Sequence, residues 1–113
     1  MTARRVLGQT GEAAVADWYV SRGYEVIARN WRCREGEIDL IVADRRTMVF
    51  CEVKARTTGR FGTPAEAVTP AKQARLRRLA ARWLAEAPTR RPVVRFDVAG
   101  VQDGQVDVCE RAF

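Results

Sequence analysis

Two hydrophobic segments on either side of a short turn at residues 44–47 each end in charged residues. They are predicted to form a β-hairpin that places Asp39 directly across from Glu52. The same register places Glu37 across from Lys54. Because side chains alternate between the faces of a strand, one face is predicted to be entirely apolar: Ile38, Leu40, Val42, Val49, Cys51 and Val53. The other face is predicted to be apolar near the turn and charged at its open end.

Two carboxylates that face each other on neighbouring strands repel, so this pair needs an explanation. A hard divalent cation supplies one, because Mg²⁺ and Mn²⁺ bind carboxylate oxygens and keep several waters. Such an ion can activate a water and stabilise charge on a phosphodiester. Lys54 shares a face with Glu52 and can orient the water or stabilise the transition state. The alternative is an ordinary salt bridge at a strand end, Glu52–Lys54 or Glu37–Lys54.

Missing residue types narrow the chemistry further. The chain has no histidine, and Ser21 is its only serine. Histidine general bases, histidine-ligated zinc and Ser-His-Asp triads are therefore excluded. The three cysteines form no CxxC spacing, so neither a disulfide framework nor a zinc site is expected, and a reducing cytoplasm fits. Catalysis, if present, must use carboxylates, lysine, arginine and a metal ion.

The charge of the chain indicates an anionic partner. The 113 residues carry a net charge of +6, and residues 72–95 hold eight basic side chains against a single acid, Glu86. Such a patch favours nucleic acid first, and an anionic membrane second. No segment approaches the ~18 apolar residues of a membrane span, and no secretion signal is recognised. A cytoplasmic protein of one domain, residues 1–113, is expected, with homodimer formation left open.

The hydrophobic pattern predicts elements in the order α-β-β-β-α-β-β. Thr69-Pro70 is a typical helix start and Asp103-Gly104 a typical hairpin turn. The predicted helices cover residues 9–22 and 69–87, and the predicted strands cover 24–31, 38–43, 48–54, 93–101 and 106–109. Residues 55–68 are predicted to be a loop. The fold class that follows is an α/β protein with a mixed sheet flanked by helices.

A basic stripe on the second helix is the predicted nucleic-acid surface: Lys72, Arg75, Arg78 and Arg82. Such side chains bind phosphates without reading sequence, although a merely solvated face is the alternative. Arg56 and Arg60 of the loop add charge. Phe61 can stack on a base or tuck onto the core, and the sequence leaves this open. Asp97, between Phe96 and Val98, is interpreted as the structural partner of an arginine.

At these residues the chain resembles a known group of proteins. Gly36-Glu37-Ile38-Asp39-Leu40-Ile41, followed by Val49-Phe50-Cys51-Glu52-Val53-Lys54, is similar to the D…ExK core of the restriction-endonuclease-like, or PD-(D/E)xK, superfamily. More narrowly, it resembles the YraN-like bacterial family, related in fold to archaeal Holliday junction resolvases. The similarity extends to Gly11-Glu12, Gly23-Tyr24, Arg29-Asn30, Lys72 and Arg95-Phe96-Asp97-Val98, and so covers nearly the whole chain.

The resemblance implies a restriction-endonuclease-like fold and roles for individual residues. Asp39, Glu52 and the Val53 carbonyl would be metal ligands, and Lys54 the catalytic lysine. Glu12 matches the position from which some resolvase-like enzymes add a carboxylate ligand. Gln73 matches a polar residue often placed beside the site.

Together these observations predict a nuclease that uses Mg²⁺ or Mn²⁺ and acts on branched or otherwise non-standard DNA. One departure from the superfamily pattern is visible, since Ile38 rather than proline precedes Asp39. A catalytically inactive nucleic-acid-binding module is the second hypothesis, because folds of this kind also serve as binding modules. A membrane or protein adaptor is the third.

Overall fold

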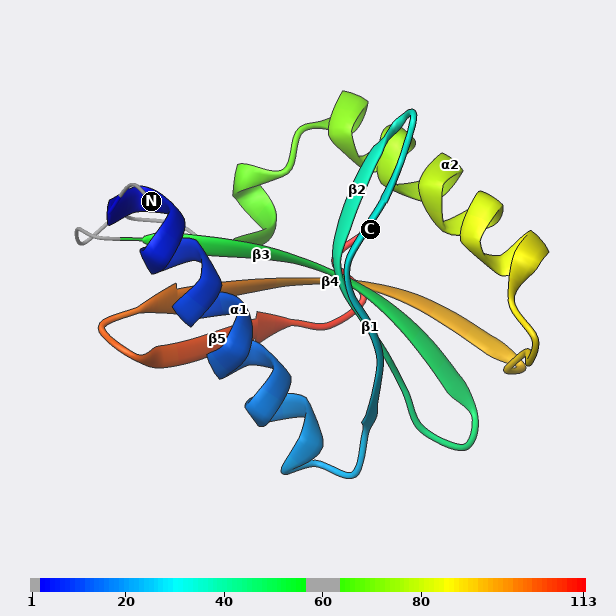
Figure 1. The fold of residues 1–113 in the computed structure, drawn as a ribbon, viewed down its shortest axis with the longest axis horizontal. Coiled ribbons are helices and arrows are strands. Elements are labelled where there is room, and N and C mark those ends of the chain that lie inside the picture. Colours follow the sequence, from blue (N-terminus) through cyan, green and yellow to red (C-terminus); the bar gives the residue numbers. More distant parts are fainter. Residues whose placement is uncertain (1–2, 57–63) are drawn as a thin grey trace.

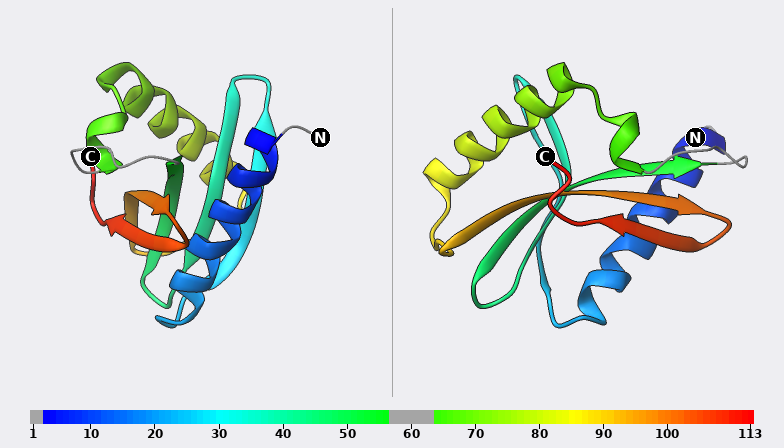
Figure 2. Two further views of the ribbon diagram at one scale, coloured as in Figure 1. Left: turned by 90° about the vertical axis from the view of Figure 1, so that its left-hand side faces the viewer. Right: turned by 180° about the vertical axis from the view of Figure 1, so that it is seen from behind.

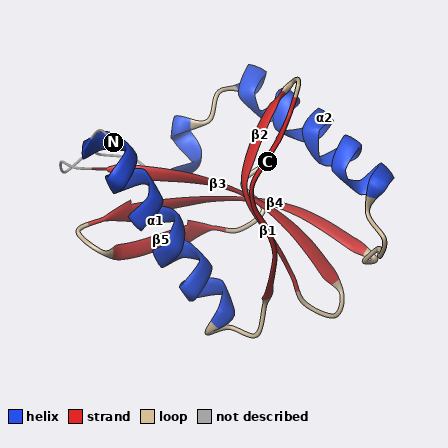
Figure 3. Cartoon of the chain, viewed as in Figure 1, coloured by secondary structure: helices blue, strands red, loops and turns tan. Residues whose placement is uncertain are grey.

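A computed structural model describes residues 3–56 and 64–113, and its elements follow the predicted order (Figures 1 and 3). The helices are α1 (Ala3–Val20) and α2 (Pro70–Glu86), with a short 3₁₀ helix, η1 (Pro64–Ala67), before α2. The strands are β1 (Glu25–Cys33), β2 (Gly36–Ala43), β3 (Thr47–Arg56), β4 (Val93–Gln102) and β5 (Gln105–Cys109). The fold class is therefore confirmed.

The strands form one mixed sheet in the order β1-β2-β3-β4-β5. Only β3 and β4 run parallel, because α2 carries the chain across between them. The Asp103-Gly104 turn between β4 and β5 has positive φ at both residues, 51° and 77°, as the predicted two-residue turn requires.

The two helices cover opposite faces of the sheet, as the turned views show (Figure 2). Under α1 lies a cluster centred on Val15, Tyr19, Leu40 and Cys51. The cluster under α2 is centred on Ile41, Phe50, Leu79 and Phe96. The strand pair β2–β3 contributes to both clusters and is therefore buried on both faces, as its near-continuous apolar sequence predicts.

The predicted apolar face of the hairpin is wrong at one position. Ile38 packs in the cluster under α2, whereas Leu40 packs in the cluster under α1. The regular alternation is interrupted at Asp39, which lies opposite Asn30 of β1. Asn30 has a φ of 51°, a conformation that breaks the regular geometry of a strand. The sheet is thus irregular at the very residue predicted to be chemically active.

The predicted loop over residues 55–68 is also wrong in part. Strand β3 continues to Arg56, and η1 begins at Pro64. Val68 is 3% exposed and joins the cluster under α2. Pro64 lies so close to Gly100 that a Cβ atom at Gly100 would be 2.8 Å from the Pro64 ring. Burial of these apolar residues orders the segment that leads into α2.

The first turn of α2 is fixed as its sequence predicts. Thr69 is the N-cap, and its hydroxyl oxygen accepts a hydrogen bond of 3.2 Å from the Lys72 amide. Pro70 occupies the first helical position, where a missing N–H costs nothing. This cap sets the point at which Lys72 and Gln73 project. Among the described residues, no helix is long and apolar enough to cross a membrane.

Candidate active site

The predicted hairpin register is confirmed from the turn as far as the pair Leu40 and Cys51. Beyond this pair the two strands separate, and the side chain of Asp39 bridges the gap. Its Oδ2 atom accepts a hydrogen bond of 2.9 Å from the Val53 amide. The carboxyl group of Asp39 also lies beside that of Glu52 and interacts with it. The two residues predicted to face each other are therefore in contact.

The Asp39 carboxyl group is strongly perturbed. Burial raises its pKa, and so do its hydrogen bond with Glu52 and the charge of that residue. The Val53 N–H lowers the pKa, and the net result is a pKa of about 8. A pKa of this value keeps the Asp39 carboxyl group largely protonated at neutral pH. Two carboxylates that cannot both ionise are the expected state of such a pair when no cation is bound.

A third carboxylate approaches from α1. Burial raises the pKa of Glu12, and the charges of Glu37 and Glu52 raise it further, while a hydrogen bond from Asn30 lowers it. Glu12 in turn raises the pKa of Asp39. The spacing of charged residues in the sequence could not indicate that the uncharged Asn30 lies beside this site. Asn30 lies at the irregular point of β1, where its φ is 51°, and it interacts with Glu12.

Lys72 of α2, which was predicted only as a nucleic-acid contact and as part of the family resemblance, also lies in this site. Its Nζ is 3.2 Å from Oε2 of Glu52, and their side chains are only 27% and 11% exposed. Lys72 was predicted to belong to the phosphate-binding stripe, but here it is paired with a predicted metal ligand. The position of the helix start could have indicated that Lys72 lies in the site, because the cap at Thr69 begins α2 near the open end of the hairpin.

Lys54 lies beside Lys72, and the two ammonium groups affect each other. Burial and the neighbouring Lys72 lower the pKa of Lys54, while the charges of Glu52 and Asp39 raise it. Lys54 is therefore a half-buried cation close to both predicted metal ligands. Among the described residues neither Glu52–Lys54 nor Glu37–Lys54 forms the salt bridge of the alternative explanation, because Glu52 is paired with Lys72 and Glu37 with Arg32.

Glu37 does not lie across from Lys54, and this prediction was wrong. It is paired instead with Arg32 of β1, at 2.9 Å between Nε and Oε2. The reason is that β2 and β3 have already separated at Asp39, so that β2 pairs at Glu37 only with β1. Glu37 is exposed and acts on the site only through its charge.

The remaining predicted site residues are less closely associated with this cluster. The side-chain amide of Gln73 donates a hydrogen bond of 3.1 Å to the Val68 carbonyl, so its role beside the site stays a prediction. Arg75 and Arg78 are exposed. Arg82 is paired with Glu35 at 3.2 Å. Three predicted nucleic-acid contacts, the side chain of Arg56 and the residues Arg60 and Phe61, lie outside the described part of the chain.

The donor set can be compared with the needs of Mg²⁺ or Mn²⁺. Within the described residues no three acidic or cysteine side chains are close enough together to hold a metal. Asp39 and Glu52 remain, with the main chain at Val53, and Mg²⁺ is usually bound by one or two carboxylates and several waters. The ammonium of Lys72, 3.2 Å from Glu52, already places a positive charge against this carboxylate, so the residues fit a cation. A role of Glu12 as a direct ligand stays a prediction.

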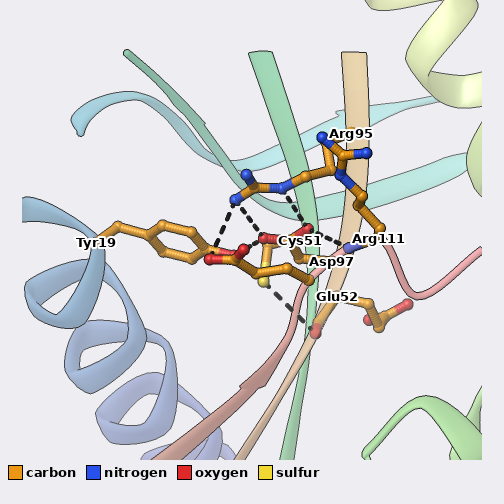
Figure 4. A network of polar contacts seen from close by, with 7 residues as sticks. Tyr19, Cys51, Glu52, Arg95, Asp97 and Arg111 are labelled. Carbon is orange, nitrogen blue, oxygen red and sulfur yellow. Dashed lines mark hydrogen bonds and ion pairs between the residues drawn. The ribbon is translucent and has the colours of Figure 1, made fainter. Parts of the chain in front are cut away.

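Behind the site, a buried network ties β3, β4 and α1 together (Figure 4). Asp97 is fully buried, and its carboxylate accepts two hydrogen bonds from Arg95, at 2.9 and 3.0 Å. The Tyr19 hydroxyl and the Arg111 amide also donate to it. The interpretation of Asp97 as an arginine partner is confirmed. Cys51, next to Glu52, pairs with Asp97 in the sheet, so the network anchors the strand that carries Glu52.

This fold, with a mixed sheet between two helices and a D…ExK cluster at the parting of two strands, is that of a restriction-endonuclease-like protein. The chain belongs to the family described as "Uncharacterised protein family UPF0102", whose model matches residues 11–101. A UPF0102 protein of Frankia casuarinae is 55% identical over 87% of this chain and 83% of its own. One of Mycolicibacterium vanbaalenii is 52% identical over 96% and 89%. One of Symbiobacterium thermophilum is 53% identical over 90% and 86%.

Proposed function

We propose that this protein is a divalent-metal-dependent nuclease that hydrolyses phosphodiester bonds in branched or otherwise non-standard DNA. The observation that carries the proposal is the contact between Asp39 and Glu52 beside two lysines, Lys54 and Lys72. A structural role gives no reason to collect two carboxylates and two ammonium groups at the end of a buried strand pair. Groups of both signs are needed where a cation and a phosphate meet.

Each residue has a role that follows from its position. Bound Mg²⁺ or Mn²⁺ would supply a Lewis acid and a water of lowered pKa. Asp39 and Glu52 would hold that ion, and Asp39 would release its proton as they do so. The Val53 N–H keeps the Asp39 carboxylate in place, since it donates to Oδ2 at 2.9 Å. The ammonium of Lys54 would stabilise negative charge on the reacting phosphate.

The basic surface supports DNA as the substrate. The chain carries a net charge of +6. Arg75 and Arg78 are exposed on α2, the helix that also supplies Lys72 to the site. Exposed arginines on this helix can bind the phosphate backbone and hold a strand near the carboxylates, without reading its sequence. The preference for branched DNA rests on the resemblance to resolvases.

The test is a cleavage screen. Wild-type protein is mixed with single-stranded, duplex, flap and four-way DNA, and with RNA, in Mg²⁺, Mn²⁺ or EDTA. We expect metal-dependent cleavage of at least one branched DNA, and none by Asp39→Asn. Glu37→Gln is the matched control, because Glu37 is on the same strand but is paired with Arg32 outside the site. If no substrate is cleaved while DNA is bound firmly, the second candidate, an inactive binding module, replaces the nuclease.

A further inference from the structure

The ion pair between Lys72 and Glu52 is more buried than two other ion pairs in the described part of the chain. Arg32–Glu37 and Arg82–Glu35 join side chains that are 44–74% exposed, and such pairs add little stability. Lys72 and Glu52 are 27% and 11% exposed, so their charges act on each other through less water. The pair also joins α2 to β3, two elements that meet at the candidate site. It is therefore a specific feature of that site.

Structural stabilisation alone explains this pair poorly. Lys72 brings a second ammonium group next to Lys54, and two neighbouring cations repel each other. A helix held to a strand by an ion pair needs only one cation. Lys72 is also placed against the carboxylate that a divalent ion would need, and not against an exposed acid of the same surface. Its position indicates that it substitutes for a cation.

We propose that Lys72 is a built-in counter-cation, whose ammonium group occupies Glu52 until a divalent metal displaces it. The proposal rests on the proposed function of the site. The ammonium stabilises the carboxylates in the metal-free protein and competes directly with the metal. The long flexible stem of lysine lets the charge move aside while the helix stays in place. Lys72 thereby sets the metal concentration at which the site becomes occupied.

The proposed competition predicts the direction in which the affinity for Mn²⁺ changes when the ammonium group of Lys72 is removed. If Lys72 were only a structural contact, its removal would loosen the site and weaken metal binding. If it competes with the metal, its removal leaves Glu52 without a partner and increases metal affinity. For a partly buried ion pair we expect roughly a three- to tenfold gain. The readout is the Kd for Mn²⁺, measured by isothermal titration calorimetry without DNA.

Three variants make the experiment specific. Lys72→Met removes the ammonium and keeps most of the stem, and Lys72→Arg keeps the positive charge. Arg75→Met removes an equal charge from an exposed position one turn along the same helix. We expect tighter Mn²⁺ binding only in Lys72→Met, and near wild-type affinity in the other two. In EDTA, Lys72→Met should melt at a lower temperature than wild type, and saturating Mn²⁺ should restore more of its stability.

The outcomes separate this proposal from the nuclease. If wild type binds Mn²⁺ and Lys72→Met binds it equally or more weakly, the counter-cation is refuted and the nuclease is untouched. If the Mn²⁺ affinities change as expected but no nucleic acid is cleaved, the role of Lys72 as a counter-cation is supported and the nuclease activity is refuted. If none of the proteins binds Mn²⁺, both are refuted. If Lys72→Met does not fold, Lys72→Gln takes its place, because it also removes the ammonium; Mn²⁺ binding by Lys72→Gln that is no tighter than wild type would refute the counter-cation.

Discussion

The amide of Val53 donates a hydrogen bond to the carboxylate of Asp39 at 2.9 Å, at the point where their strands stop pairing. A side chain here takes the place of a main-chain acceptor across the hairpin. The bond costs the sheet nothing, because the Val53 N–H is satisfied, and it fixes one oxygen of Asp39. The parting of the strands thus creates room for a site and orients its first carboxylate.

This relationship predicts the effect of Asp39→Asn. The amide oxygen of asparagine can still accept from Val53, so the variant should fold. It should lose the increase in melting temperature that Mn²⁺ gives the wild type by mass action, which amounts to ~2.7 kcal/mol at a hundredfold excess over Kd. The measurement is thermal unfolding in EDTA and in a Mn²⁺ series, with Glu37→Gln as the control. An equal Mn²⁺ shift in wild type and Asp39→Asn would remove Asp39 from the metal site.

The raised pKa of Asp39 predicts an unusual pH dependence of stability in the metal-free protein. The carboxyl has a pKa of about 8 in the folded protein, against an ordinary value of 3.8 in an unfolded chain. Between these values the folded protein binds a proton that the unfolded chain lacks. The free energy of unfolding should therefore fall as pH rises through this window, by at most about 1.4 kcal/mol per pH unit, and level off above it.

Urea denaturation between about pH 5 and pH 9 in EDTA measures the effect, because this range spans the upper part of the window and the plateau above it. Asp39→Asn should flatten the slope, because an amide does not titrate. Glu12, whose pKa burial also raises, should account for part of any slope that remains at the acidic end. A wild-type stability that rises from neutral to alkaline pH would contradict the raised pKa of Asp39.

The buried network around Asp97 predicts a loss of stability without a loss of metal binding. Tyr19→Phe removes one donor to a buried carboxylate and should cost about 1.5–3 kcal/mol. Asp97→Ala should cost more, ~3–5 kcal/mol, because the largely buried guanidinium of Arg95 loses its closest partner and keeps only the exposed Glu110, at 3.7 Å. Denaturant unfolding measures both, and Mn²⁺ affinity should be near wild type in Tyr19→Phe. A large drop in that affinity would make the network part of the metal site.

Much of the fold followed from local signals in the sequence. The cap at Thr69-Pro70 and the turn at Asp103-Gly104 were recognised because each depends on residues within one turn of chain. The contact between Asp39 and Glu52 was also predictable, since a hairpin register fixes which residues face each other.

The errors lie where a structure departs from regular geometry or joins distant elements. Strict alternation put Ile38 beside Leu40, and only the positive φ of Asn30 across the sheet explains why it packs elsewhere. Glu37 was paired with Lys54 because nothing in the hairpin sequence shows that the strands separate. Lys72 was assigned to a solvent-facing stripe, because its pairing with Glu52 depends on how α2 docks on the sheet.

The exposed arginines of α2 predict a salt-dependent affinity for DNA. Arg75→Ala with Arg78→Ala should weaken binding and flatten the dependence of log affinity on log salt, by ~0.9 for each lost phosphate contact on duplex DNA. Fluorescence anisotropy over a salt series measures this slope. Arg45→Ala with Arg46→Ala is the control, since these exposed residues lie at the hairpin turn, away from α2. Equal slopes in wild type and the α2 variant would show that the stripe is merely solvated.

The final prediction separates turnover from binding at Lys54. Lys54→Met keeps the stem and removes the ammonium, which is half-buried beside the carboxylates and faces the reacting phosphate in the proposed mechanism. Losing one such electrostatic stabiliser typically costs ~10²–10³ in rate, whereas losing one phosphate contact changes affinity far less. Single-turnover cleavage and anisotropy on a four-way junction should therefore show a large fall in rate and a small change in Kd.

The comparison needs Asp39→Asn measured on the same junction. That variant should abolish cleavage for a different reason, loss of the metal, and it can bind DNA more tightly, because it removes negative charge from a site that faces phosphate. Lys54→Met should keep wild-type Mn²⁺ affinity, and Asp39→Asn should not. If both variants still cleave, the reaction takes place elsewhere on the protein. If Lys54→Met loses DNA affinity and cleavage rate by the same factor, Lys54 binds the substrate and does not stabilise the transition state. Another group must then stabilise the negative charge of the transition state. Among the described residues, Lys72 is the cation found beside Lys54.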